Sequence, residues 1–230
     1  MFDFNAGIYL GDQCLVGLLD EIGSQYSVYE LKAFTMGVLM GITPFHPSRI
    51  VEIIISKDQI IFKNQDQAER FLSQFLALWN LLLVAPRAPE IFSTLKNTLD
   101  DPIKLMDSLH KTKGELSYLL EGLHLTGVRT ELIDDEMAGD IFLSFTQIDK
   151  TLSDLQKILE IKDLSNEEHF HNLKQLFDDT ETIWTNGYAP LRIHIEELRP
   201  YESIDDEEPL PLYEDVFSDL LRIATIKSSL

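Results

Sequence analysis

The chain has 230 residues, with 19 Lys and Arg against 39 Asp and Glu, and a formal net charge of −20 at pH 7. This acidity argues against nucleic acid as a direct partner, because binding to phosphates requires a basic surface. Hydrophobic residues make up 44% of the chain, which is enough for a folded core. The single cysteine, Cys14, excludes a disulfide scaffold and a zinc site built from cysteines.

The apolar residues near the N-terminus do not resemble a secretory signal, because they lack a basic flank and are interrupted by Asp3 and Asp12. No segment reaches the roughly 18 uninterrupted apolar residues that span a bilayer. We therefore expect a cytoplasmic protein with no membrane partner. In that setting Cys14 is expected to be a small buried hydrophobic residue.

Apolar residues recur at the spacing of α-helices in three long segments and one short segment. The segments are 26–42, 64–84, 102–125 and 216–224. Turn-forming residues separate the periodic segments at 43–48, 85–90, 125–131, 186–190 and 199–212. The sequence predicts an all-α fold, a multi-helical bundle of about eight to ten helices with short connections. Residues 1–127 and 128–230 form its two regions, packed as one globular unit.

Two segments allow alternative structures. Residues 50–62 contain two β-branched runs, which suit either a short hairpin or a helix followed by a loop. We favour the helix, capped by Ser48 and running from about Arg49 to Ser56. Residues 141–159 place apolar side chains at alternating steps of four and three, the spacing of a narrow helical seam. This seam belongs either to an antiparallel bundle helix or to a homodimer interface.

The pattern of residues 28–127 resembles the YecA/YgfB-like family of small acidic bacterial proteins. The resemblance rests on FTMGVLMGITP (34–44), Pro47-Ser48, IFKNQDQAERFL (61–72), Leu78-Trp79-Asn80 and LLEGLHLTG (119–127). Ile50 and Leu119 stand where the family usually has Trp, and the cysteine-rich metal-binding tail of some relatives is absent. The resemblance implies an all-helical fold and no established enzymatic activity, and it supplies no catalytic residues.

Gly37 and Gly41 lie four residues apart, on one face of a predicted helix. Each glycine costs about 1 kcal/mol of helix stability relative to alanine. We expect the two glycines to allow another helix backbone to approach closely, with the approach of a ligand as the alternative.

A repeated Glu-x-x-His pattern is the main candidate for chemistry, and its residues are Glu121, His124, Glu168 and His171. Two such pairs on neighbouring helices are typical of di-iron and di-manganese bundles. The alternative is a solvated flank at Glu168–His171 and a partly buried polar pair at Glu121–His124. His46, between Phe45 and Pro47, is expected to cap or hydrogen-bond locally in a turn.

An acidic segment, residues 201–219, contains eight acidic residues and no Lys or Arg. It forms either a solvated loop that leads into a last helix or a docking strip for a basic partner protein. The predicted partner-binding residues are Tyr201, Asp205, Asp206, Glu207, Glu208, Tyr213 and Phe217.

The sequence contains no glycine-rich phosphate loop and no G-x-S-x-G nucleophile elbow. Together with the acidity and the family resemblance, this favours a non-enzymatic protein-interaction or regulatory module without a cofactor. The alternative is a helical protein that binds iron or manganese through the two Glu-x-x-His pairs.

Overall fold

The computed structural model describes residues 8–43, 45–85, 87, 89–93, 102–129 and 167–198, with isolated positions between 136 and 156. These residues form six α-helices and no strand, which confirms the expected all-α fold class. The helices are α1 (Asp12–Ile22), α2 (Val28–Leu39), α3 (Pro47–Lys57), α4 (Gln65–Leu83), α5 (Pro102–Leu125) and α7 (Glu167–Leu198).

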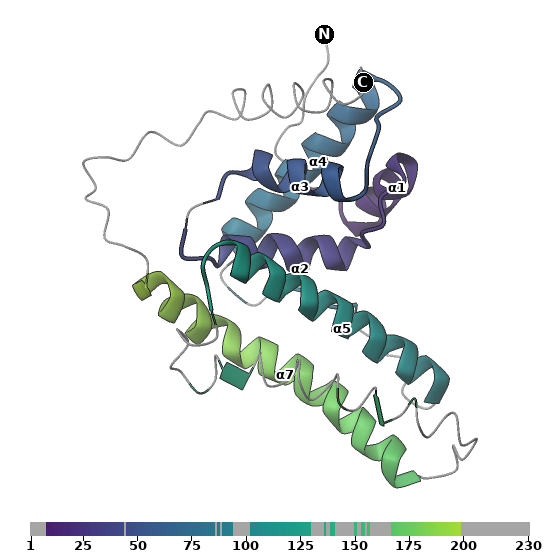
Figure 1. Ribbon diagram of the computed structural model, residues 1–230, viewed down its shortest axis with the longest axis vertical. Helices are drawn as coiled ribbons and strands as arrows, with labels where there is room; N and C mark the ends of the chain where they lie inside the picture. Colours follow the sequence, from purple (N-terminus) through teal and green to yellow (C-terminus); the bar gives the residue numbers. More distant parts are fainter. Residues whose placement is uncertain are drawn as a thin grey trace.

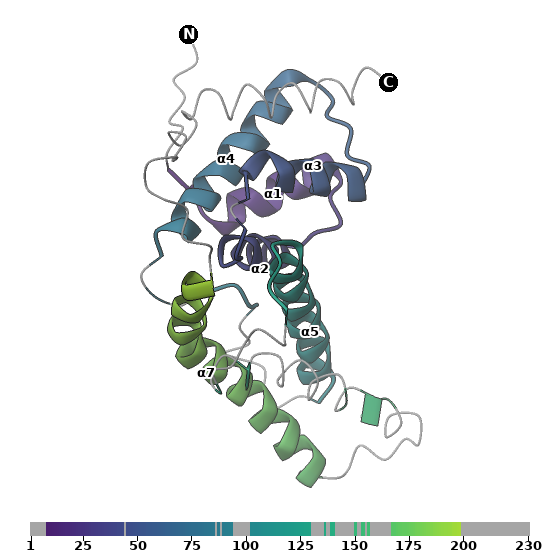
Figure 2. The same ribbon diagram turned by 60° about the vertical axis from the view of Figure 1, so that its left-hand side comes forward.

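Helices α1 to α4 form one block, and α5 and α7 extend away from it side by side (Figures 1 and 2). Helix α2 lies at the base of the block and makes the most extensive helix–helix contact with α5. These two helices run in the same direction, because Glu30, Gly37 and Gly41 meet Gly114, Gly122 and Thr126 in order. No described helix is both long enough and apolar enough to cross a membrane.

Side chains that accept hydrogen bonds from the backbone set the starts of three helices. Ser27 and Glu30 form a capping box at α2, and the Asn64 side chain accepts a hydrogen bond from the Gln67 N–H at α4. At α3 the His46 ring accepts one from the Ser48 N–H, and Pro47 occupies the first helical position. The local capping role of His46 is therefore confirmed, whereas the assignment of Ser48 as the cap is wrong by two residues.

The helix over residues 47–57 decides between the two structures expected for 50–62. Ile50, Val51, Ile54 and Ile55 are all buried, and they repeat with the spacing of one helix face. Gln59 then adopts a positive φ of 52°, which does not continue the helix. The next residue, Ile60, is buried in the core. Tertiary burial thus outweighs the β propensity of the branched residues.

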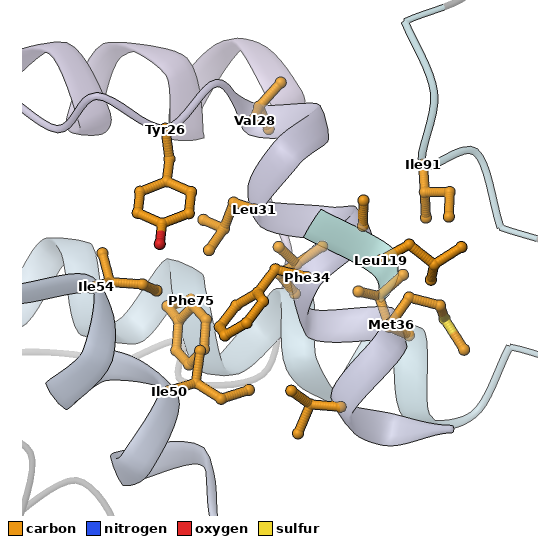
Figure 3. Close-up of a cluster of buried hydrophobic side chains, with 14 of the residues drawn as sticks. Tyr26, Val28, Leu31, Phe34, Met36, Ile50, Ile54, Phe75, Ile91 and Leu119 are labelled. Carbon is orange, nitrogen blue, oxygen red and sulfur yellow. The ribbon is translucent and has the colours of Figure 1, made fainter. Parts of the chain in front are cut away.

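The apolar stripes predicted at 26–42, 64–84 and 102–125 join residues of α1, α3 and α7 in one continuous core, part of which is drawn in Figure 3. Phe34, Phe71 and Phe75 are completely buried within it. The helix boundaries predicted at 64–84 and 102–125 agree with α4 and α5 to within one residue at each end. These stripes are broad enough for the hydrophobic effect to fix which face of each helix points inward.

Gly37 of α2 allows the backbone of α5 to approach closely, which confirms the packing interpretation at this position. A Cβ atom on Gly37 would overlap the Leu119 carbonyl oxygen and lie 3.0 Å from the Leu123 nitrogen. Gly41 lies just beyond the end of α2, and a Cβ atom there would overlap the side chain of Thr126 rather than a backbone. The helices could not come this close with larger residues at these positions.

The predicted break at 186–190 is wrong, because α7 continues through Pro190. Proline removes the hydrogen bond to the carbonyl four residues earlier, and that carbonyl belongs to Asn186, which is exposed and open to water. The buried residues Trp184, Tyr188 and Leu191 lie on both sides of the position and hold the helix against the core. Helix α1 was not anticipated, although Leu15, Leu18, Leu19 and Ile22 have helical spacing.

Several predicted features lie outside the described residues. They are the apolar positions of the 141–159 seam, the acidic segment 201–219 and the apolar stripe at 216–224.

Candidate functional site

Helix α7 presents an acidic outer face in the described part of the chain. It contains seven acidic residues but only two basic ones, Lys174 and Arg192. Its buried stripe is formed by Trp184, Tyr188, Leu191 and Ile195, so the helix has one inner face. The exposed acidic side chains in the described part of this helix point away from the buried stripe. They are Glu168, Asp178, Asp179, Glu196 and Glu197.

The inner face of α7 is held by the segment that follows α4. The Trp184 indole N–H donates to the Pro89 carbonyl at 3.1 Å, and its ring meets Phe92 edge-on. The Arg192 guanidinium donates to the Ala85 carbonyl at 3.1 Å. These contacts fix the rotation of α7, and therefore fix which of its residues face outward.

Ile193 stands on this outer face with 58% of its surface exposed. Glu196 and Glu197 follow it by three and four positions, so they share its side of the helix. An apolar side chain bordered by carboxylates suits a basic partner that also offers an apolar contact.

The four predicted metal ligands are separated in the structure. Glu121 and His124 lie near the C-terminal end of α5, whereas Glu168 and His171 lie near the N-terminal end of α7 (Figure 1). Helices α5 and α7 run in the same direction in Figure 1, so the pairs are at opposite ends of this layer. All four side chains are exposed, and the described residues contain no group of three or more metal-ligating side chains.

A cation at the end of α3 meets two aromatic rings, one from α5 and one from the loop before α2. The Lys57 ammonium lies 4.9 Å from the centre of the Tyr118 ring and 5.6 Å from that of Tyr26. It also donates to both carboxylate oxygens of Glu121, at 3.2 Å each. We call this group of four residues the tyrosine cage.

The surroundings of the tyrosine cage add negative charge to it. Burial raises the pKa of the Tyr118 hydroxyl, and the carboxylates of Glu30, Glu121 and Asp58 raise it further, whereas Lys57 lowers it. The same three carboxylates raise the pKa of Tyr26, for which burial is the largest cause. Three anions therefore act on these rings against one ammonium.

Glu115 is a buried carboxylate on α5, with 2% of its surface exposed. It accepts a hydrogen bond from the Ser93 backbone N–H at 3.0 Å and so ties α5 to the segment before it. Burial raises the pKa of the Glu115 carboxyl, and the bond to Ser93 only partly offsets this increase. The stability that the packed Glu115 side chain contributes therefore depends on pH.

A buried cation, Lys32, is paired near the start of α1. Lys32, which is 7% exposed, lies 2.7 Å from the Asp12 carboxylate, and the Tyr9 hydroxyl donates to the same carboxylate at 2.7 Å. Burial raises the pKa of the Tyr9 hydroxyl, and the bond to Asp12 raises it further. All three groups have partners within the protein, which favours a structural role.

Comparison of the chain with models of protein families, with curated proteins and with solved structures finds no significant match.

Sequence reasoning did not single out the tyrosine cage. Lys57 and Glu121 are 64 positions apart, and no local pattern connects them with Tyr26. A lysine at the end of a helix and a tyrosine on an apolar face are individually common. Only the tertiary fold brings the last residue of α3, the residues of α5 and the loop before α2 together.

Proposed function

We propose that the protein is a non-enzymatic interaction or regulatory module that binds a basic partner protein through an acidic surface. The observation that carries the proposal is the outer face of α7, where exposed carboxylates follow the helix and two of them, Glu196 and Glu197, lie beside the exposed Ile193. The predicted docking residues of 201–219 follow α7 in the sequence and would extend this acidic surface. The resemblance to YecA/YgfB-like proteins, which have no established enzymatic activity, belongs to the same proposal.

The expected roles of charge and apolar contact differ. Complementary charges mainly speed the encounter between partners and select against acidic ones, whereas buried aromatic and aliphatic side chains supply most of the affinity. Exposed charges are screened beyond about 10 Å at 0.1 M salt. A homodimer formed through 141–159 is compatible with this function, and light scattering of the purified protein tests for it.

The experiment is affinity capture from native lysate at low ionic strength, with the wild type and two charge variants. The first variant neutralises α7 through Asp178→Asn, Asp179→Asn and Glu197→Gln. It leaves Glu196 in place, because that residue pairs with Arg192. The second variant neutralises the docking strip through Asp205→Asn, Asp206→Asn, Glu207→Gln and Glu208→Gln. We expect the wild type to capture a basic protein that one or both variants lose.

A third variant serves as the matched control, because it removes three exposed acids from other helices through Asp20→Asn, Glu52→Gln and Asp107→Asn. It should retain the partner if location matters as well as total charge. Capture of the same proteins by all variants, or of none by the wild type, would contradict the proposal.

A further inference from the structure

The geometry points to a receptor for an arginine side chain, formed by Tyr26, Tyr118 and Glu121 and filled by Lys57 when no partner is bound. The inference rests on the proposed function, because it adds to the acidic face of α7 a second place at which the same basic partner would be recognised. The ligand is an arginine on an exposed segment of that partner. Lys57 is the resident cation that this arginine replaces.

The contacts of Lys57 define the chemistry of the receptor. Two tyrosine rings, 5.0 Å apart and tilted by 47°, present their faces to one ammonium group. The faces of aromatic rings carry negative charge density, so such a pair attracts cations. Glu121 adds a full negative charge on the third side. The site therefore selects for positive charge combined with an apolar stem.

The resident lysine can be exchanged at small cost. Its side chain is 44% exposed and that of Glu121 is 47% exposed, so both are accessible from solvent. Exposed ion pairs and exposed cation–π contacts each contribute little to stability. When another cation enters, the Lys57 ammonium regains its hydration, which compensates for most of this loss.

The surrounding carboxylates keep the receptor negative after the exchange. Glu30 is held by the capping box of α2, in which it accepts a hydrogen bond from the Ser27 N–H at 2.7 Å. Asp58 accepts hydrogen bonds from the Ser24 hydroxyl and from the Gln25 N–H. These two carboxylates are fixed by their local bonds, so they contribute attraction without having to move.

Arginine fits the receptor better than a second lysine. Both oxygens of Glu121 lie 3.2 Å from the Lys57 nitrogen, so both face the position that the cation occupies. A guanidinium group can bond both oxygens in parallel and can stack its plane on a tyrosine ring, whereas an ammonium group is a point charge. An arginine can therefore displace Lys57 although the two groups carry equal charge.

The experiment measures binding of a fluorescent serine–arginine peptide, and of its serine–lysine counterpart, to the full chain by anisotropy at low salt. The wild type should prefer the arginine peptide. Lys57→Met removes the competing charge but keeps an unbranched side chain, and it should tighten binding about two- to fivefold. Glu121→Gln should weaken binding by a similar factor.

Matched controls remove the same charges elsewhere on the surface. Lys63→Met is the control for Lys57→Met, and Glu52→Gln is the control for Glu121→Gln, because both residues are exposed and lie outside the tyrosine cage. Each control should change affinity less than its counterpart. Circular dichroism and thermal melting verify that every variant is folded.

Peptide binding should also shift the ring signals of Tyr118 in an NMR spectrum of the wild type. Equal effects of each variant and its control, or unshifted Tyr118 signals on binding, would overturn the receptor while leaving the acidic interaction module intact. Absence of peptide binding to the wild type and to every variant also overturns the receptor. The proposed function is tested separately by the capture from lysate.

Discussion

Gly37 on α2 and Gly122 on α5 lie face to face, and a Cβ atom on Gly122 would be 2.5 Å from the Phe34 carbonyl oxygen. The two helices therefore touch through their backbones. This contact joins the block formed by α1 to α4 to the layer formed by α5 and α7. It also fixes the position of α5 along α2, and therefore where Tyr118 and Glu121 lie relative to Lys57.

Gly122→Ala should destabilise the protein by about 1–3 kcal/mol, because the added methyl group forces the two backbones apart. The gain in helix propensity, about 1 kcal/mol, offsets only part of this cost. Gly17→Ala in α1 is the matched control, since a Cβ atom there meets nothing within 4 Å. It should be neutral or stabilising. Urea denaturation measures both variants, and equal effects would contradict the close backbone contact.

Trp184→Ala should cost about 3–5 kcal/mol, the usual penalty for removing a large buried aromatic side chain. The variant loses the packing on Phe92 and the hydrogen bond to the Pro89 carbonyl. Hydrogen exchange should show the largest loss of protection in α7. Ile193→Ala, on the exposed face of the same helix, should change stability by less than about 0.5 kcal/mol. A small effect of Trp184→Ala would mean that α7 is not held through this side chain.

Glu115→Gln should make the protein more stable than the wild type at neutral pH, and this advantage should shrink as the pH is lowered. Because burial raises the folded-state pKa of the Glu115 carboxyl, folding favours its protonated form. The wild-type contribution is fully present below the unfolded pKa, and it is lost as the pH rises through the raised folded pKa. Glutamine stays neutral and can still accept the Ser93 N–H bond.

Denaturant melts of wild type and Glu115→Gln at several pH values, from about pH 4 to pH 8, provide the test. Glu52→Gln is the control at an exposed position, and its difference from the wild type should vary little with pH. An advantage of Glu115→Gln that stays constant or grows toward acid would show that the carboxylate is not the group disfavoured by burial.

His46→Ala should destabilise the protein by about 0.5–2 kcal/mol, because the Ser48 N–H at the start of α3 loses its acceptor. His46→Asn should restore most of that stability, since asparagine is among the preferred capping residues. Thermal melts of the two variants make the comparison. Equal losses in both would assign the effect to packing of the imidazole ring rather than to the cap.

Much of the fold could be predicted from the sequence because broad apolar stripes determine it locally. The stripe at 102–125 gives α5 its bounds, and Gly37 marks the close approach of its partner helix. The break predicted at Pro190 is wrong because the burial of α7 residues on both sides of the proline outweighs a single missing hydrogen bond. His46 displaced Ser48 as the cap because Pro47 already suits the first helical turn.

The candidate site could be predicted only in part. The acidity is visible in the composition, but the outer face of α7 is defined by its contacts with Ala85 and Pro89. The repeated Glu-x-x-His pattern shows that spacing alone does not bring residues together, since the two pairs lie at opposite ends of parallel helices. The tyrosine cage depends on residues from three distant parts of the chain.

The salt dependence of partner capture tests the central claim most directly. The unmodified protein is used to capture partners from lysate over a range from about 0.05 M to 0.5 M salt. Across this range the Debye length, and with it the reach of electrostatic attraction, shortens severalfold. The account predicts a basic protein that is held at low salt and released progressively as the salt rises. A partner retained unchanged at high salt, or an acidic partner, would contradict binding through the acidic surface.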